Sequence, residues 1–182
     1  MSHYRRSNTP NATYFFTVVT YRRQRFLCDE PVRHALKKAI IKVKAQYPFK
    51  IDAWVLLPDH IHTIWTLPEN DANFSLRWQL IKRYVTHECG SYLNRPEFHS
   101  ASKAKHQEAT LWQRRFWEHQ IRDESDYQTH MDYCHFNPVK HGLVKHVRDW
   151  EHSSFHKHVN LGLHPSDWAG EGLGEAGQFG DD

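Results

Sequence analysis

The chain of 182 residues has few cysteines and no long apolar segment. Its thiols, Cys28, Cys89 and Cys134, are odd in number and form no CxxC pair, which argues against a disulfide framework and against a thiolate zinc site. No stretch approaches the roughly 20 apolar residues that span a bilayer, and residues 1–10 lack the apolar core of a secretory signal. We therefore expect a protein of the reducing cytoplasm with no membrane partner.

Basic side chains are absent after Lys157, whereas five acids follow it, at Asp167, Glu171, Glu175, Asp181 and Asp182. Residues 1–157 therefore carry 24 basic and 16 acidic side chains (21 − 5), a net charge of +8. Such a basic body fits a nucleic-acid partner, although a merely soluble basic protein has the same balance. We expect one domain over 1–160 and a glycine-rich acidic tail over 161–182. This tail either lies over the DNA-binding face or only solubilises the chain.

Hydrophobic periodicity predicts an α+β domain. The expected strands are 13–20, 49–57, 60–67 and 111–121, and the expected helices are 30–46, 73–89 and 123–137. The order β-α-β-β-α-β predicts a ferredoxin-like antiparallel sheet with helices on one face, followed here by a further helix. The polar stretch 91–110 predicts a long surface loop, and Pro138 predicts that the last helix ends near Asn137.

The sequence Pro58-Asp59-His60-Ile61-His62 is the first candidate site. Alternate side chains of a strand share a face, so His60 and His62 would project together, about 7 Å apart along the strand, and could hold one metal ion. The alternative is two ordinary strand histidines. Asp59 either orients a histidine without touching the metal itself, or has no role beyond the turn.

A second candidate lies on the helix expected over 123–137. Tyr133 and Asn137 are four residues apart and therefore neighbours on one helix face. The amide oxygen of Asn137 suits a hard cation such as Mg²⁺ or Mn²⁺, and the phenol of Tyr133 would lie beside that ion. The alternative is a tyrosine packed in the core and an asparagine that closes the helix. Tyr127 on the same helix is the other candidate nucleophile. The residue four positions after it is Met131, which offers no amide or acid.

Three segments together resemble a known family: LLPDHIHTIW (56–65), LWQRRFWEHQIRDE (111–124) and HMDYCHFNPVKHGLV (130–144). They look like the single-tyrosine HUH transposases, and in particular the REP-associated tyrosine transposases of bacteria. The likeness runs from Tyr4 to about Trp168 and implies the HUH endonuclease fold. Many relatives carry Tyr at the position of Phe116, and the Phe here cannot act as a nucleophile.

The resemblance also implies the roles of individual residues. It assigns the paired metal ligands to His60 and His62, the third ligand to Asn137 and the nucleophile to Tyr133, with Mg²⁺ or Mn²⁺ as cofactor. The implied activity is a DNA endonuclease and strand transferase that nicks single-stranded or palindromic hairpin DNA through a 5′-phosphotyrosine and can rejoin it. A monomer associated with the bacterial nucleoid is implied as well.

Basic side chains supply the expected DNA contacts, and most of them would otherwise be solvated surface charge. Lys140 is also a candidate to stabilise the tyrosine anion, because it is close to Tyr133 in sequence. The remaining candidates are Arg5, Arg6, Arg22, Arg23, Arg25, Lys82, Arg83, Arg114, Arg115 and Arg122.

Three other functions remain open. A rolling-circle replication initiator or relaxase would use the same chemistry, although the short chain shows no helicase domain. A metal-dependent hydrolase using activated water would work without Tyr133. A non-catalytic DNA-binding module would keep the basic residues and tolerate the loss of either His60 or His62.

Overall fold

The structure is a computed structural model that describes residues 9–106 and 108–168. Its strands are β1 (Thr13–Val19), β2 (Lys50–Leu56), β3 (His60–Thr66) and β4 (Trp117–Gln120). Its helices are α1 (Glu30–Gln46), α2 (Phe74–Leu93), α3 (Ala101–Lys105), α4 (Glu124–Lys140) and α5 (Phe155–Asn160), with 3-10 turns η1 (Tyr21–Arg23), η2 (Pro96–Phe98) and η3 (Val147–Asp149). The strands form one antiparallel sheet in the order β2-β3-β1-β4, which confirms the ferredoxin-like prediction.

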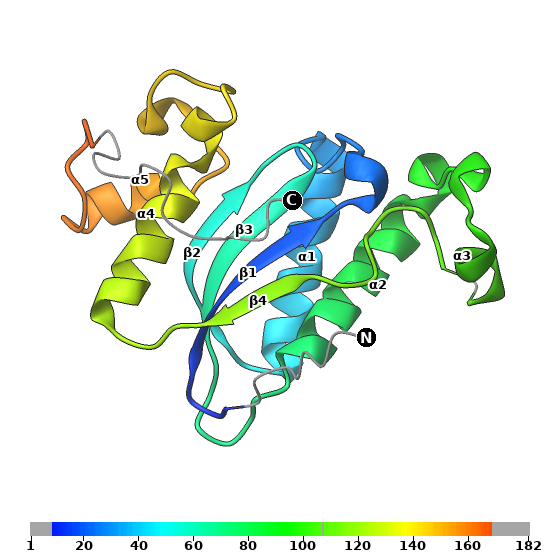
Figure 1. Cartoon of the computed structure of the whole chain (residues 1–182), viewed down its shortest axis with the longest axis horizontal. Coiled ribbons are helices and arrows are strands. Elements are labelled where there is room, and N and C mark those ends of the chain that lie inside the picture. Colours follow the sequence, from blue (N-terminus) through cyan, green and yellow to red (C-terminus); the bar gives the residue numbers. More distant parts are fainter. Residues whose placement is uncertain (1–8, 107, 169–182) are drawn as a thin grey trace.

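The sheet separates two hydrophobic cores because alternate side chains of a strand point to opposite faces. On β1, Tyr14, Phe16 and Val18 join the core beneath α1 and α2, while Phe15 joins the core beneath α4. The helices predicted to cover one face of the sheet are therefore α1 and α2. Helix α4 lies across the other face (Figure 1). This second face carries the predicted site.

The elements before α3 match their predicted positions closely. Helix α1 has a proline in its first turn and buries Val32, Leu36, Ala39 and Val43 at helical spacing. Helix α2 begins as expected after Asn73, whose side-chain oxygen accepts a hydrogen bond from the Leu76 N–H at 3.0 Å.

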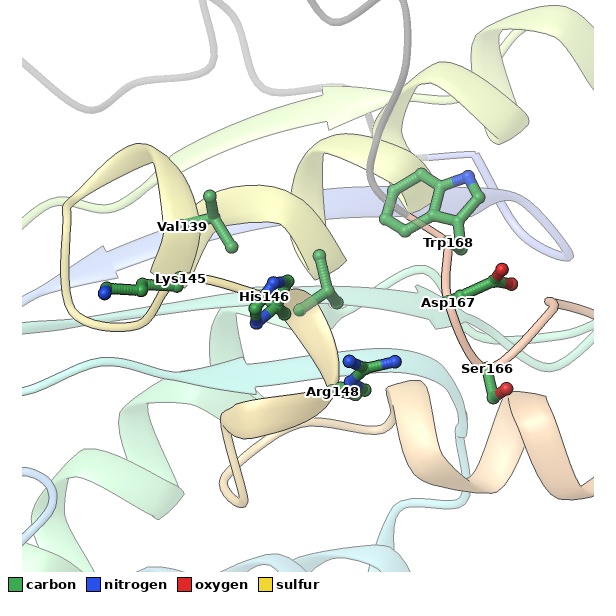
Figure 2. A pocket seen from close by; sticks show the side chains of 8 residues that line it. Val139, Lys145, His146, Arg148, Ser166, Asp167 and Trp168 are labelled. Atoms are coloured by element: carbon green, nitrogen blue, oxygen red, sulfur yellow. The ribbon is translucent and has the colours of Figure 1, made fainter.

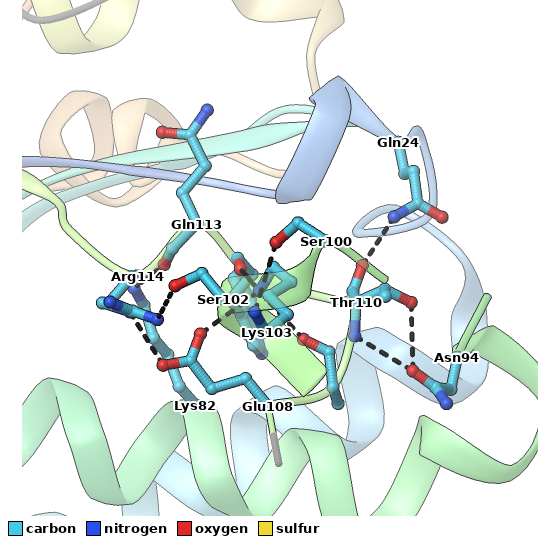
Figure 3. Close-up of polar contacts among 12 residues, drawn as sticks. Gln24, Lys82, Asn94, Ser100, Ser102, Lys103, Glu108, Thr110, Gln113 and Arg114 are labelled. Atoms are coloured by element: carbon cyan, nitrogen blue, oxygen red, sulfur yellow. Dashed lines mark hydrogen bonds and ion pairs between the residues drawn. The ribbon is translucent and has the colours of Figure 1, made fainter. Parts of the chain in front are cut away.

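The prediction of a long surface loop over 91–110 is wrong. Residues 91–93 continue α2, and η2 and α3 follow. Figure 3 shows why so polar a segment is ordered: its polar groups bond to one another. The Asn94 side-chain oxygen accepts from both the N–H and the hydroxyl of Thr110, and the buried amine of Lys103 donates to the Ala109 and Trp112 carbonyls.

Two further boundaries differ from the sequence prediction. Strand β4 is shorter than the predicted strand 111–121. Residues 111–116 precede it, and in the described part of the chain their only isolated β-bridge joins Trp112 to Thr20. Helix α4 continues through Pro138 to Lys140, so Asn137 lies inside the helix and not at its end. Beyond the proline, the His141 N–H donates to the Asn137 carbonyl four residues before, and the Leu143 N–H closes the end of the helix by donating to the Pro138 carbonyl.

Candidate active site

Strand β3 places the two predicted histidines side by side on the α4 face of the sheet. His60 is paired with Val19 of β1, and His62 is paired with Thr17. Their ring centroids are 4.8 Å apart, and their exposed fractions are 1% and 0%. Ile61 points to the opposite core, as the strand alternation predicts.

Hydrogen bonds fix the rings of both histidines through Nδ1. The Asp59 carboxylate oxygen Oδ1 lies 2.7 Å from His60 Nδ1, and the Thr17 hydroxyl lies 2.9 Å from His62 Nδ1. Nε2 is thereby the nitrogen that each ring offers to a ligand, and His60 Nε2 is buried with no hydrogen bond among the described residues. In metal sites, groups that do not touch the metal commonly orient the imidazole ligands through hydrogen bonds of this kind.

The Asp59 carboxyl is ionised at neutral pH. Burial opposes its ionisation, but the hydrogen bond to His60 and the charges of His60 and Arg23 hold its pKa below the usual value. The guanidinium of Arg23 lies 3.7 Å from the Asp59 carboxylate and 3.5 Å from His60 Nδ1. The expectation that Asp59 supports a histidine therefore has a direct structural basis.

Helix α4 carries the other two predicted residues over the same face. The rings of Tyr133 and His62 are 5.3 Å apart. Asn137 is fully buried, and neither its amide oxygen nor its amide nitrogen has a hydrogen bond among the described residues. A buried amide without partners costs roughly 1–3 kcal/mol, and coordination of a cation by its oxygen would offset that cost. Two imidazole nitrogens and this oxygen therefore fit a divalent cation.

The tyrosine oxygen receives a hydrogen bond from a cation. Lys140 Nζ donates to Tyr133 Oη at 2.8 Å and lies 4.6 Å from the centre of the phenol ring. The ammonium is placed to offset negative charge that the Tyr133 oxygen would carry after losing its proton, at a side chain that is 5% exposed.

The rival tyrosine has acids near it where Tyr133 has a cation. Burial, together with the negative charges of Asp52 and Glu124, raises the pKa of Tyr127 to about 12. A nucleophilic phenol needs a partner for its negative charge, so of these two tyrosines on α4 the better candidate is Tyr133, whose oxygen is hydrogen-bonded to Lys140.

Comparison with known proteins agrees with this geometry. The family model described as "Transposase IS200 like" matches residues 8–137. The chain belongs to the IS200-like transposase family. It is 48% identical to the REP-associated tyrosine transposase of Escherichia coli (strain K12) over 94% of this chain and 93% of that protein. A Haemophilus influenzae protein assigned to the same group is 40% identical over 93% of this chain and 94% of its own.

A solved structure supports the fold of this transposase over nearly its whole length. It is described as a REP-associated tyrosine transposase bound to a REP hairpin, and it is 47% identical. The two chains superpose with a TM-score of 0.81 over 98% of each. This transposase is thus an enzyme that acts on DNA, and no helix in the described part of its chain is long and apolar enough to cross a membrane.

Sequence reasoning missed two residues that contact the paired histidines. Thr17 was not predicted because its contact with His62 depends on the register between β1 and β3. His141 caps α4, with its ring 5.0 Å from that of His60. Burial, with the charges of His60 and Lys140, lowers the pKa of His141. Its place directly after Lys140 in the PVKHG segment was the available signal.

Several predicted DNA-contacting residues of the transposase gather at the His60 end of the sheet. The segment after β1 and the segment before β4 run together there, because the Tyr21 N–H donates to the Leu111 carbonyl and the Gln113 N–H to the Val19 carbonyl. Lys82 joins them by donating to the Gln113 carbonyl at 2.9 Å (Figure 3). The basic residues of these two segments, here called the arginine strip, are Arg22, Arg23, Arg114 and Arg115.

The other predicted contacts lie elsewhere. Arg83 is on α2 and lines a groove between α1 and α2, on the far side of the sheet from α4. Arg122 follows β4 at the opposite end from the arginine strip, and its Nε lies 3.2 Å from the Asp126 carboxylate. Arg5 and Arg6 fall outside the described residues, as do residues 169–182 of the predicted acidic tail.

Proposed function

We propose that this transposase nicks single-stranded or hairpin DNA with palindromic repeats through a covalent bond to Tyr133, and rejoins it by the reverse reaction. The observation that carries the proposal is the 2.8 Å hydrogen bond from Lys140 to the Tyr133 oxygen, beside two oriented histidines. The class of DNA is supported by the similar structure, which holds a REP hairpin.

His60, His62 and Asn137 would hold one Mg²⁺ or Mn²⁺ ion. When bound, such an ion supplies Lewis-acid polarisation and orientation of the scissile phosphate. Asp59 and Thr17 keep the two imidazoles aimed at the ion through their Nδ1 atoms. The buried amide of Asn137, which has no hydrogen-bond partner in the described part of the chain, is the feature that best supports its assignment as the third ligand.

The bond changes at phosphorus balance without a further reactant. Tyr133 Oη loses its proton to solvent, stabilised as an anion by Lys140, and bonds to the phosphorus. The bond from phosphorus to the 3′ oxygen breaks, and that oxygen takes up a proton. The 5′ phosphate then remains on Tyr133, and attack by a 3′ hydroxyl of the same or another strand reverses the step.

Two of the alternative functions make different demands on these residues. A hydrolase using activated water would need the histidines but would leave Tyr133 without a role, which the contact with Lys140 disfavours. A DNA-binding module would not need three buried ligand groups. A relaxase or replication initiator shares the chemistry and differs in the DNA that it processes.

The test is formation of a covalent protein–DNA adduct. Purified protein is incubated with 3′-end-labelled palindromic single-stranded DNA and Mg²⁺ or Mn²⁺, so that the labelled 5′-phosphate fragment would stay with the protein on a denaturing gel. We expect the adduct with wild type, and none with EDTA, His60→Ala or His62→Ala. An undiminished adduct in EDTA would overturn the metal assignment.

A further inference from the structure

Three histidines meet on a different side of α4 from Tyr133. They are His135 of α4, His158 of α5 and His164, which follows α5, and one ring nitrogen from each lies within 4.8 Å of the others. The ring of His135 is 4.8 Å from that of His158 and 5.3 Å from that of His164, centre to centre. His135 is fully buried, and His158 is 6% exposed.

The partners of these rings determine which nitrogens are available. His158 Nε2 lies 2.9 Å from the Asp52 carbonyl, which can only accept, so Nε2 carries the hydrogen and Nδ1 carries the lone pair. His135 Nε2 lies 3.1 Å from the Ser154 hydroxyl, whose oxygen also accepts from the Trp54 N–H. His135 Nδ1 is buried and has no hydrogen bond among the described residues.

We propose that His135, His158 and His164 form a second metal site, which binds a zinc-class divalent cation. Three imidazoles without a carboxylate favour Zn²⁺, Co²⁺ or Ni²⁺ over Mg²⁺, whose preferred ligands are oxygens. With a metal on Nδ1, His135 would donate its Nε2–H to the Ser154 hydroxyl, as His158 donates its Nε2–H to the Asp52 carbonyl; metal-binding histidines commonly have such partners. A water molecule would complete a tetrahedral shell.

The electrostatics of the cluster suit a cation. Burial, and then the charges that the neighbouring histidines would carry, lower the pKa of both His135 and His158, and burial lowers the pKa of His164. The neutral imidazole is the form that donates a lone pair to a metal. The carboxylate of Asp132, whose negative charge acts on His164, would offset part of the charge of the ion.

A second group of possible ligands consists of His119, Asp126 and His130. Its ligand atoms are already engaged in hydrogen bonds. The Asp126 carboxylate is already bonded to His119 Nε2 at 2.8 Å and to Arg122, and it lies 3.1 Å from His130 Nδ1. Its atoms bind one another, which makes it a hydrogen-bonded network at the start of α4. The contrast supports a metal only at the three histidines.

The ion would tie the segment after α5 to the helix that carries Tyr133 and Asn137. Trp168 already packs in this region, with its ring 5.1 Å from that of His164 and 6.0 Å from that of Phe155. Figure 2 shows Ser166, Asp167 and Trp168 along one side of a pocket whose other walls come from Val139 of α4 and the segment 145–148. Metal binding should therefore stabilise this end of the fold.

The test separates this site from the one at His60 and His62. A His60→Ala, His62→Ala double variant of the full chain removes the first site, and Zn²⁺ binding is then measured by competition with a chromophoric chelator and Co²⁺ binding by its visible absorption. We expect one equivalent of either ion, a tetrahedral Co²⁺ spectrum and a higher Tm with Zn²⁺. Adding His164→Gln should weaken binding at least about tenfold and remove the Tm shift.

His156→Gln is the matched control, because His156 is exposed on the same helix α5 and is not in the cluster. It should keep the full affinity and the Co²⁺ spectrum. His164 is only half-buried, so His164→Gln should fold with an unchanged Tm in chelator, whatever His135→Gln does. The proposal is wrong if the double variant binds no stoichiometric Zn²⁺, or if His164→Gln and His158→Gln both bind it as tightly as the control. Since the double variant lacks the first site, this outcome is independent of the proposed nicking reaction.

Discussion

At the scale of single residues, surroundings rather than residue type distinguish the proposed nucleophile, Tyr133, from Tyr127. Tyr127 and Tyr133 lie on the same helix, yet burial and two acids raise the pKa of Tyr127 to about 12, whereas Tyr133 receives a hydrogen bond from Lys140. A stabilised anion on Tyr133 is the condition for attack on phosphorus near neutral pH. The contribution of Lys140 can be measured directly.

Replacing Lys140 by methionine should slow cleavage by about 10²-fold at pH 7, because the phenolate loses a charge-assisted hydrogen bond. The rate should recover as pH rises, since hydroxide then removes the phenol proton without help from Lys140. The measurement is single-turnover cleavage between pH 6 and 10. Lys38→Met, an exposed lysine of α1 on the far side of the sheet, is the control. Equal rates for Lys140→Met and wild type at every pH would contradict the role of Lys140.

Asp59 should act on the metal through His60. Asp59→Ala removes the partner of His60 Nδ1 and should weaken Mn²⁺ binding by about 10–100-fold, with most cleavage restored at saturating Mn²⁺. Asp59→Asn keeps an oxygen acceptor, so its Mn²⁺ affinity should lie between those of wild type and Asp59→Ala. Electron paramagnetic resonance titration of Mn²⁺ reports the affinity. Unchanged affinity in Asp59→Ala would mean that the carboxylate only shapes the turn.

The strand pair of histidines and the helical tyrosine could be predicted from sequence because strand and helix periodicity are local properties. Thr17 and His141 could not, because each reaches a histidine only through tertiary structure: the register of β1 against β3, and the packing of α4 on the sheet. The role of Lys140 was predicted from its closeness in sequence and is supported by geometry.

At the scale of elements, α4 is organised by charged groups at its start and by packing at its end. Burial opposes ionisation of Asp126, but hydrogen bonds from His119 and Arg122 lower the pKa of its carboxyl to about 2. The Asp123 side chain caps the helix by accepting from the Asp126 N–H at 2.9 Å. At the other end, packing of the buried Asn137 and Pro138 outweighs the preference of proline for helix ends.

Asp126→Asn should therefore lower the free energy of unfolding at pH 7 by roughly 1–2 kcal/mol. The folded pKa lies below the value of about 3.9 in unfolded chains, so the contribution is complete above that value and is lost as pH falls toward 2. Urea unfolding in chelator at pH 7, 4 and 2.5 should show the two proteins converging. Asp132→Asn is the control on the same helix: burial raises the pKa of Asp132, so its removal should not destabilise the fold at pH 7. A constant difference at all three pH values would contradict the assignment.

The segment between α2 and β4 shows where element prediction fails. Residues 94–110 have no apolar periodicity, and their order comes from long-range bonds such as Gln24 to the Thr110 carbonyl at 2.6 Å. Such bonds link residues far apart in sequence, so composition alone predicts only a loop. The central strands and α1, whose apolar spacing is regular, were placed within one or two residues.

At the scale of the whole molecule, the two faces of the sheet have different tasks. Helices α1 and α2 cover one face, which holds the larger apolar core, and α4 covers the other (Figure 1). His60, His62 and Tyr133 lie on the α4 face. The arginine strip lies at the His60 end of that sheet, so we expect DNA to approach the histidines from that end. Arg83 lines the groove between α1 and α2 on the other side, so we do not expect it to contact DNA bound there.

Binding of a REP-type hairpin should therefore weaken steeply with salt, and the strip should supply part of that dependence. Arg22→Gln with Arg115→Gln should reduce the slope of log affinity against log salt by about 1.4–1.8, since each lost phosphate contact removes about 0.7–0.9. Fluorescence anisotropy between 50 and 300 mM salt gives the slope. Arg83→Gln should leave it unchanged. If Arg83→Gln reduced the salt slope by the same amount, basic charge would contribute to binding regardless of which face of the sheet carries it.

The most direct test of the central claim is the identity of the residue that becomes linked to DNA. Wild type, Tyr133→Phe and Tyr127→Phe are incubated with labelled palindromic single-stranded DNA and Mn²⁺, and the adduct is digested and located by peptide mass spectrometry. We predict a phosphotyrosine at Tyr133 in wild type and in Tyr127→Phe. Tyr133→Phe should form no adduct while retaining its Tm and its affinity for the hairpin. An adduct formed by Tyr133→Phe at the wild-type rate, or a link mapped to any other residue in wild type, would contradict the account.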